Sequence, residues 1–240
     1  MKHMLLKTLL IYSTVIFAST SYAATPMDMP VFEDPTAMSV DQLRSEIPKL
    51  NRALGANPPS FFNVNHKNQI YKQWSEYLGA ALILQPKSKD EATEKVHILA
   101  TLFVQGYNLN VTGMAVKAHE AIQFCLKVAP ESSECKLLSA MFYMSADATK
   151  LEEVKQTLFA LREQYGKHKN AEVEIALAYY HIYANDHKAA LEQIDAIDVF
   201  FEHLYNDNIK KYRLEHLKEF KVAILLEQAK KQDQKQTPTE

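Results

Sequence analysis

The sequence predicts an all-α protein organised around three successive helical hairpins between residues 99 and 197. The first observation is a 36-residue register in which similar side chains recur. The second is composition, because only five of the 240 residues are glycine and helix-forming Ala, Leu, Lys, Glu and Gln are abundant. The third is a set of capping boxes, which begin helices. Four rows of the register are Tyr107, Tyr143 and Tyr179; Ala118, Val154 and Ala190; Ile122, Leu158 and Ile194; and Cys125, Leu161 and Ile197.

Residues 1–23 have the features of a secretory signal peptide. A basic start precedes an apolar stretch from Leu9 to Ala18, and Ser21-Tyr22-Ala23 matches the pattern that signal peptidase recognises. We expect cleavage after Ala23, with Ala24 as the alternative. The apolar stretch is too short for a bilayer, which takes roughly 20 residues. The sequence therefore predicts a periplasmic or secreted protein without stable membrane insertion after cleavage. Residues 24–38, which hold three prolines, are expected to form an extended lead-in.

The mature chain carries a small negative charge. Residues 1–23 contain two of the 27 basic residues and no acidic one, so 25 basic and 29 acidic side chains remain. Nucleic-acid-binding proteins instead carry a strong basic excess on one face. The balance of charge therefore argues against a nucleic acid as partner.

Residues 39–87 predict an N-terminal helical pair. Ser39-Val40-Asp41-Gln42 is a capping box that begins the first helix, and Pro48 is expected to kink or split it. The second helix is expected from about residue 65 to residue 84. It carries Trp74, the only tryptophan, which we expect to be a core anchor between the first helices.

Residues 88–198 predict the three hairpins, punctuated by turn and capping signals. Capping boxes begin at Ser88 and Thr149, Gly113 lies in the first turn, and Gly166 suits a left-handed C-terminal cap. The expected helices are 88–109 and 114–129, 133–146 and 149–165, and 170–184 and 186–197.

Residues 199–230 predict C-terminal capping helices. Apolar residues suggest a short helix over residues 199–205, and a periodic stripe predicts a long helix from residue 208 to about residue 230. Residues 231–240 are polar and are expected to be a disordered tail.

The register resembles a tetratricopeptide repeat (TPR), a helical hairpin that stacks into a solenoid. Gly106 and Ala118 stand where the family has small residues that let the two helices cross closely, and Pro130 closes the unit. The period is two residues longer than the usual length of about 34, and Phe142 and Val154 replace the small pair in the second copy. The resemblance implies a right-handed α-solenoid of about three TPR-like hairpins with N-terminal and C-terminal capping helices.

The resemblance also implies a concave groove, lined by the first helix of each hairpin, that binds a protein or peptide partner. The three tyrosines suit protein recognition because they are large and rigid and carry a hydrogen-bonding tip. Tyrosines at this spacing are equally typical of a core in which the backbone satisfies the hydroxyl. The implied lining is Phe103, Tyr107 and Asn110; Ser139, Tyr143 and Ala146; and Ile175, Tyr179 and Ile182.

Cys125 and Cys135 are the only two cysteines. An even, closely spaced pair in an oxidising compartment suggests a disulfide across a helix–turn–helix. The alternative is two buried thiols that pack as small apolar residues.

The sequence offers no specific catalytic or metal motif. Glu94-Lys95-Val96-His97 matches half of the pattern of di-iron helix bundles, which need two such motifs and further carboxylates. We therefore expect no catalytic residue, no metal and no cofactor. The leading hypothesis is a non-enzymatic exported adaptor that serves a cell-envelope or secretion assembly. The alternatives are a helical bundle that binds a small molecule or metal, and an enzyme whose site has no linear motif.

Overall fold

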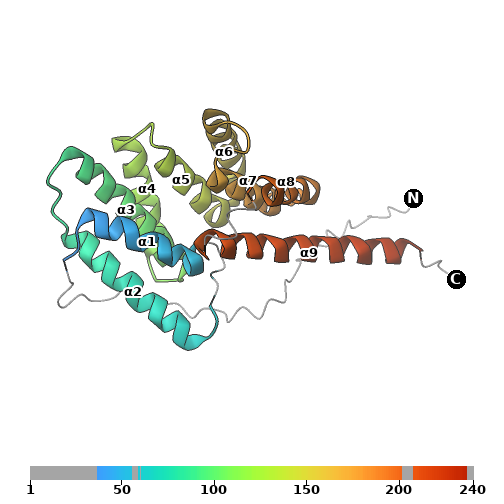
Figure 1. Ribbon diagram of the computed structural model, residues 1–240, viewed down its shortest axis with the longest axis horizontal. Coiled ribbons are helices and arrows are strands. Elements are labelled where there is room, and N and C mark those ends of the chain that lie inside the picture. Colours follow the sequence, from blue (N-terminus) through green and yellow to red (C-terminus); the bar gives the residue numbers. More distant parts are fainter. Residues whose placement is uncertain (1–36, 56–58, 60, 202–207, 237–240) are drawn as a thin grey trace, which may run out of the picture.

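The computed structural model describes residues 37–55, 59, 61–201 and 208–236, and these residues confirm the all-α class (Figure 1). The predicted signal peptide, residues 1–23, lies outside them, as does most of the lead-in. Within the described ranges no helix combines the length and the apolar character needed to cross a bilayer. The helices are α1 (Val40–Leu54), α2 (Val64–Ile83), α3 (Lys89–Asn108), α4 (Met114–Val128), α5 (Ser133–Ala146), α6 (Leu151–Tyr165), α7 (Ala171–Tyr183), α8 (His187–Phe200) and α9 (Asn208–Gln236), with a 3₁₀ turn, η1 (Ala148–Lys150), before α6.

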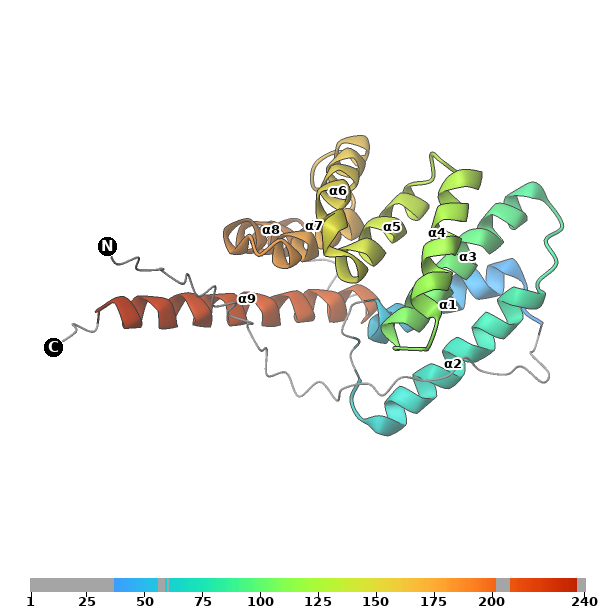
Figure 2. The same cartoon turned by 180° about the vertical axis from the view of Figure 1, so that it is seen from behind.

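The central helices pack as three consecutive pairs, α3 on α4, α5 on α6 and α7 on α8. Each second helix also contacts the first helix of the next pair, and the first helices α3, α5 and α7 contact one another in a row (Figures 1 and 2). The rows of the 36-residue register that fall on α4, α6 and α8 are all buried, with at most 2% of any side chain exposed. The periodicity therefore identified one continuous core face on these three helices.

Helix α3 is the element against which most of the N-terminal half packs. Trp74 of α2 is fully buried, and its indole Nε1–H donates to the Leu102 carbonyl of α3 at 2.7 Å. A Cβ atom on Gly106 would lie 2.5 Å from the Trp74 ring and 2.9 Å from Met114 Cγ. Gly106 is thus the point at which α2 and α4 both approach the α3 backbone, and the expectation that Trp74 is a core anchor is confirmed.

Helix α1 is continuous through Pro48, so of the kink or split expected there the split does not occur. Leu43 and Ile47 before the proline, and Leu50 and Leu54 after it, are buried in one cluster with residues of α2 and α3. Packing on both sides of Pro48 therefore keeps the helix continuous despite the missing N–H donor. The capping box at Ser39 and Gln42 is confirmed.

The capping box expected at Thr149 does not form. The Asp147 carboxylate accepts from the Thr149 backbone N–H at 3.0 Å and from its hydroxyl, so residues 148–150 form η1 before α6 begins at Leu151. Gly113, with φ of 79°, confirms the glycine turn before α4. Gly166 also has a positive φ but a ψ of 142°, which is outside the left-handed helical region expected for it.

Helix α9 is longer than predicted, because it continues past Lys230 to Gln236. Residues 231–236 are helical rather than part of a disordered tail, while 237–240 lie outside the described residues. The helix contacts α1, α7 and α8 and extends away from the other helices at its C-terminal end (Figures 1 and 2). The short helix expected over 199–205 is in part the end of α8, since α8 continues to Phe200, and residues 202–207 are outside the described part.

A buried carboxylate joins α6, α7 and α8. Glu174 is 1% exposed and accepts from Arg162 Nε and Nη2 at 2.9 and 2.8 Å, from the His168 backbone N–H at 3.0 Å, and from Gln193 Nε2 at 2.6 Å. Both carboxylate oxygens are therefore satisfied, as a buried charge requires.

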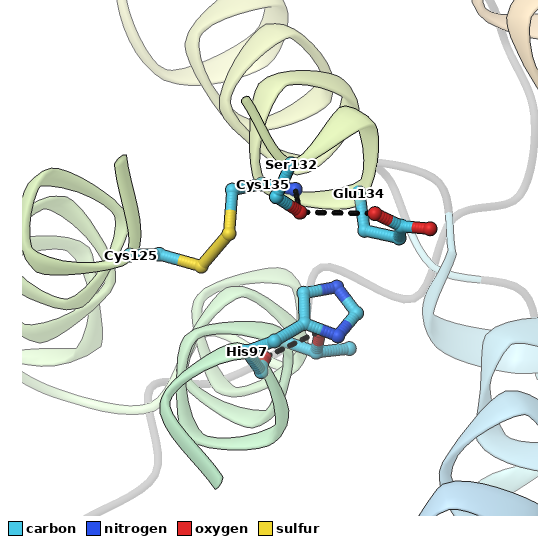
Figure 3. The surroundings of a disulfide bond; sticks show 6 residues. His97, Cys125, Ser132, Glu134 and Cys135 are labelled. Atoms are coloured by element: carbon cyan, nitrogen blue, oxygen red, sulfur yellow. Dashed lines mark hydrogen bonds between the residues drawn. A yellow bond between two sulfur atoms is a disulfide. The ribbon is translucent and has the colours of Figure 1, made fainter. Parts of the chain in front are cut away.

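Cys125 and Cys135 form a disulfide between α4 and α5, with their Cα atoms 5.9 Å apart (Figure 3). Both residues are buried. The predicted bridge is confirmed, and it covalently joins the first hairpin to the second.

We predict that Gly106→Ala lowers the free energy of unfolding by about 1–3 kcal/mol, because the added methyl group overpacks a fully buried site. Urea unfolding followed by circular dichroism measures this change. In combination with Trp74→Phe the loss should be smaller than the sum of the single losses, since the shorter ring relieves the contact. If the losses of the two single variants simply add in the double variant, the contact between residue 106 and the Trp74 ring does not limit stability.

We predict that reducing the Cys125–Cys135 disulfide lowers the free energy of unfolding by roughly 2–3 kcal/mol, because the bridge constrains a short loop of the unfolded chain. Urea unfolding with and without reductant measures the loss, and a Cys125→Ala/Cys135→Ala variant should show no effect of reductant. Two free thiols in denatured, unreduced protein would disprove the bridge.

Candidate functional site

Two adjoining hollows lie between α1 and the first helices of the hairpins, and we call them together the inner groove. One is a cavity of about 110 Å³, the inner cavity, and the other a more open hollow of about 280 Å³, the charged hollow. Asn51 of α1, Thr101 of α3 and Leu138 of α5 line both and mark where they meet. The groove therefore depends on α1 lying over α3 and α5.

The inner cavity combines apolar walls with uncharged polar groups. The apolar side chains come from α1, α3 and α5 and are Leu54, Val104, Leu138, Met141 and Met144. The polar ones come from α1, α3, α5 and α7 and are Asn51, Thr101, Gln105, Asn108, Ser145, Tyr179 and Tyr183.

Two amides of α3 fix the C-terminal half of α1 above the cavity. Gln105 Nε2 donates to Asn51 Oδ1 at 2.8 Å and to the Ile47 carbonyl at 3.4 Å, and Asn108 Nδ2 donates to the Leu54 carbonyl at 2.6 Å. Gln105 is 1% exposed, and its Oε1 atom has no hydrogen-bond partner. Most buried polar atoms in proteins are paired, so this unpaired, buried acceptor is an unusual feature of α3.

The charged hollow is bordered by an ion pair between α1 and α3. Arg44 Nε and Nη2 each lie 3.1 Å from an oxygen of Glu94. Hydrogen bonding to Glu94 raises the pKa of Arg44. Arg44 is exposed, so the pair orients the two helices more than it stabilises them.

His97 and Glu134 also line the charged hollow and lie near the disulfide (Figure 3). Burial lowers the pKa of His97, and the nearby Glu94 and Glu134 oppose that shift only in part. The Glu134 pKa is also lowered, by its backbone N–H and by the Ser132 hydroxyl. At neutral pH this end of the groove therefore holds a neutral imidazole and an ionised carboxylate.

The structure does not place the three tyrosines of the register on one open face. Tyr143 is 6% exposed, and its hydroxyl lies 2.7 Å from His119 Nδ1 of α4. Tyr179 is 4% exposed, with its hydroxyl 3.0 Å from His216 Nδ1 of α9. Tyr107 is half-buried, and its hydroxyl donates to the Ser145 carbonyl of α5 at 3.4 Å. These tyrosines chiefly join neighbouring helices.

The nine residues implied by the resemblance are divided between core and surface. Ser139, Tyr143, Ile175 and Tyr179 are buried, Phe103, Tyr107 and Ile182 are half-buried, and Asn110 and Ala146 are exposed. Of the nine, only Tyr179 lines the inner groove. Phe103 lines a separate, shallow hollow between α3 and α4 together with Leu99 and Phe124.

The groove residues of α3 lie two positions earlier in the sequence than those implied by the resemblance. Thr101, Gln105 and Asn108 follow the same spacing of four and three as Phe103, Tyr107 and Asn110. Two positions rotate a helix by about 200°, so the groove is on the opposite face of α3. A polar stripe within the otherwise largely apolar C-terminal half of α3 was the available signal.

The described residues contain no group of three or more His, Cys, Asp or Glu side chains that could hold a metal ion. Glu94 of the Glu-x-x-His motif is instead paired with Arg44. Comparison of the chain with protein families, curated proteins and solved structures finds no match.

We predict that His97 makes stability depend on pH. Its lowered pKa means that the unfolded chain binds a proton more readily than the folded one, so the free energy of unfolding falls as the pH drops below about 6.5. Urea unfolding measures the free energy of unfolding from neutral to mildly acidic pH. This free energy should decline less steeply for His97→Gln than for the unaltered protein. The same decline in both proteins would contradict this role of His97.

Proposed function

We propose that this protein is an exported, non-enzymatic adaptor of TPR-like architecture that binds a segment of a partner protein in the inner groove. The observation that carries the proposal is the groove itself, in which apolar walls and hydrogen-bonding groups follow successive first helices. Such a combination is typical of binding sites, where apolar walls give affinity and a few polar groups fix orientation.

The architecture in this proposal is a right-handed α-solenoid of TPR-like hairpins between capping helices. Support comes from the row of contacts among α3, α5 and α7 and from the burial of the repeated positions on α4, α6 and α8. Solenoids use the face formed by successive repeats as an extended binding surface. In this chain α1 covers part of that face and narrows it to the inner groove.

Export is supported by the features of residues 1–23 and by the disulfide, a bond typical of oxidising compartments. A role in a cell-envelope or secretion assembly fits such a compartment.

A peptide segment suits the groove because its two parts differ in character. The charged hollow is the more open part and presents Glu134 and the Arg44–Glu94 pair, whereas the inner cavity is uncharged. Leu138 and Met141 supply apolar contact, and methionine adapts readily to the shape of a partner. The bound segment would place a polar side chain in the charged hollow and a smaller side chain in the inner cavity. These two positions would fix the register of the segment.

Site-specific photocrosslinking tests this function. A photoreactive residue at position 137, which lines the charged hollow, should crosslink a discrete partner protein in intact cells that export the chain. The matched control is position 159 on α6, where Phe159 is 37% exposed and lies away from the groove. Adding Met141→Lys should weaken the crosslink at position 137 about tenfold, since it buries an unpaired charge.

Equal crosslinking at positions 137 and 159, or a crosslink that Met141→Lys leaves unchanged, would contradict binding in the groove. Circular dichroism of each variant establishes that the fold is retained.

A further inference from the structure

We infer that the charged hollow is the subsite that selects a basic side chain, that of Lys or Arg, from the bound partner segment. The inference rests on the proposed function for the source of that side chain. The preference for a cation rests on the residues that line the hollow.

The charged side chains that line the hollow do not balance. At neutral pH the single cation, Arg44, is opposed by two carboxylates, Glu94 and Glu134. The guanidinium of Arg44 is already bound, because two of its nitrogens each lie 3.1 Å from an oxygen of Glu94 and a third lies 3.6 Å from an oxygen of Asp41. The negative charge of Glu134 is therefore left uncompensated within the hollow.

Glu134 is ionised and accessible to a ligand. Its side chain is exposed, and hydrogen bonds from its own backbone N–H and from the Ser132 hydroxyl lower its pKa. The hydroxyl donates to Oε2 at 2.9 Å, and no ion pair joins the carboxylate to a cation among the residues that the structure describes. A carboxylate accepts several hydrogen bonds, so Oε1 is left for a donor from the ligand.

His97 supplies a further acceptor on the same side of the disulfide (Figure 3). Its ring is half-buried in the wall of the hollow, and no hydrogen bond joins either ring nitrogen to another described residue. Because burial lowers the pKa of His97, the ring is neutral at neutral pH and one of its nitrogens accepts. The ring therefore neither repels an incoming cation nor neutralises Glu134.

The walls of the hollow suit the stem of a basic side chain. They are apolar and come from three helices, and their residues are Ile47 and Pro48 of α1, Ile98 of α3, and Leu137 and Leu138 of α5. Lys and Arg bury a stem of about three or four methylene groups while the charged head stays near water. In a hollow of about 280 Å³ the stem would lie on these walls and the head would reach the exposed Glu134.

Other classes of side chain match the hollow less well. An Asp or Glu of the partner would face Glu94 and Glu134, and Arg44 could bind it only by giving up its contact with Glu94. An apolar side chain would fit the walls but would bring no donor to Glu134 or His97. A basic side chain uses both the apolar walls and the uncompensated charge.

Capped amino acids test the subsite on the full mature chain, with the methyl resonances of Leu137 and Leu138 as the readout. The Nα-acetyl methylamides of lysine and arginine should shift these resonances saturably. The norleucine derivative, which keeps the stem but lacks the charge, should bind about fivefold more weakly, and the glutamate derivative should bind more weakly still. The methyl resonances of Leu99, which lines the separate hollow between α3 and α4, should not shift.

Two variants of matched charge test the role of Glu134. Glu134→Gln removes the charge at nearly the same volume and keeps an acceptor for the Ser132 hydroxyl, so it should abolish the preference for the lysine derivative over the norleucine derivative. Glu131→Gln changes the net charge by the same amount outside the hollow, where Glu131 lies 3.1 Å from Lys136, and should leave the preference unchanged. In cells, Glu134→Gln should weaken the crosslink at position 137 about fivefold, and Glu131→Gln should not.

The subsite would be overturned by equal binding of the lysine and norleucine derivatives, or by a larger shift at Leu99 than at Leu138. A preference that survives Glu134→Gln, or one that Glu131→Gln also abolishes, would overturn it as well. If the crosslink at position 137 persists undiminished in Glu134→Gln and the lysine derivative shows no preference, the subsite is wrong and the adaptor function stands. If the lysine derivative binds selectively but the unaltered protein forms no crosslink, the chemistry of the hollow is supported and the adaptor function is wrong.

Discussion

Trp74 lies against Gly106 so closely that a single added methyl group would overlap its ring. At the same glycine Met114 of α4 also approaches the α3 backbone, and the indole N–H adds a hydrogen bond from α2 to the α3 backbone. A fully buried tryptophan contributes several kcal/mol to stability, about 3–5 kcal/mol by truncation to alanine. With α3 held in this way, Gln105 and Asn108 of the same helix reach the carbonyl groups of α1 and position it over the groove.

The far side of the groove depends on a different kind of interaction. Glu174, buried between α6, α7 and α8, is held by Arg162 and Gln193. Breaking such a pair leaves an uncompensated buried charge, which costs roughly 3–5 kcal/mol. The network therefore fixes α7, which carries Tyr179 and Tyr183 to the inner cavity. One wall is therefore held by the hydrogen bonds of Gln105 and Asn108 to α1 and the other by the Glu174 network, so little ordering is required when a ligand binds.

Glu174 and Gln105 are each 1% exposed but differ in how fully they are paired. Every oxygen of the Glu174 carboxylate accepts a hydrogen bond, as expected for a group whose role is structural. Gln105 uses its nitrogen to hold α1, and its buried oxygen has no hydrogen-bond partner. Of these two buried polar side chains, only that of Glu174 is therefore fully paired.

The sequence by itself determined the local structure. Helical periodicity and capping residues predicted the hairpins to within a few residues, since those signals depend on neighbours only three or four positions apart. The core rows on α4, α6 and α8 were likewise predicted, because small and apolar side chains recurred at fixed spacing. The disulfide was predicted because the two cysteines are close in a chain with the features of an exported protein. Pro48 and Thr149 behaved otherwise, because burial of α1 and the Asp147 carboxylate outweighed the local signals.

Only the tertiary structure decided which face of each first helix forms the groove. Helix α3 has neighbours on several sides, so its apolar residues are distributed around it and do not single out one open face. The hydroxyl of Tyr143 is satisfied by His119 of α4, and the groove appears only where α1, remote in sequence, lies over α3 and α5. Contacts between elements so far apart follow from packing of the whole chain, which the spacing of residues along one helix does not encode.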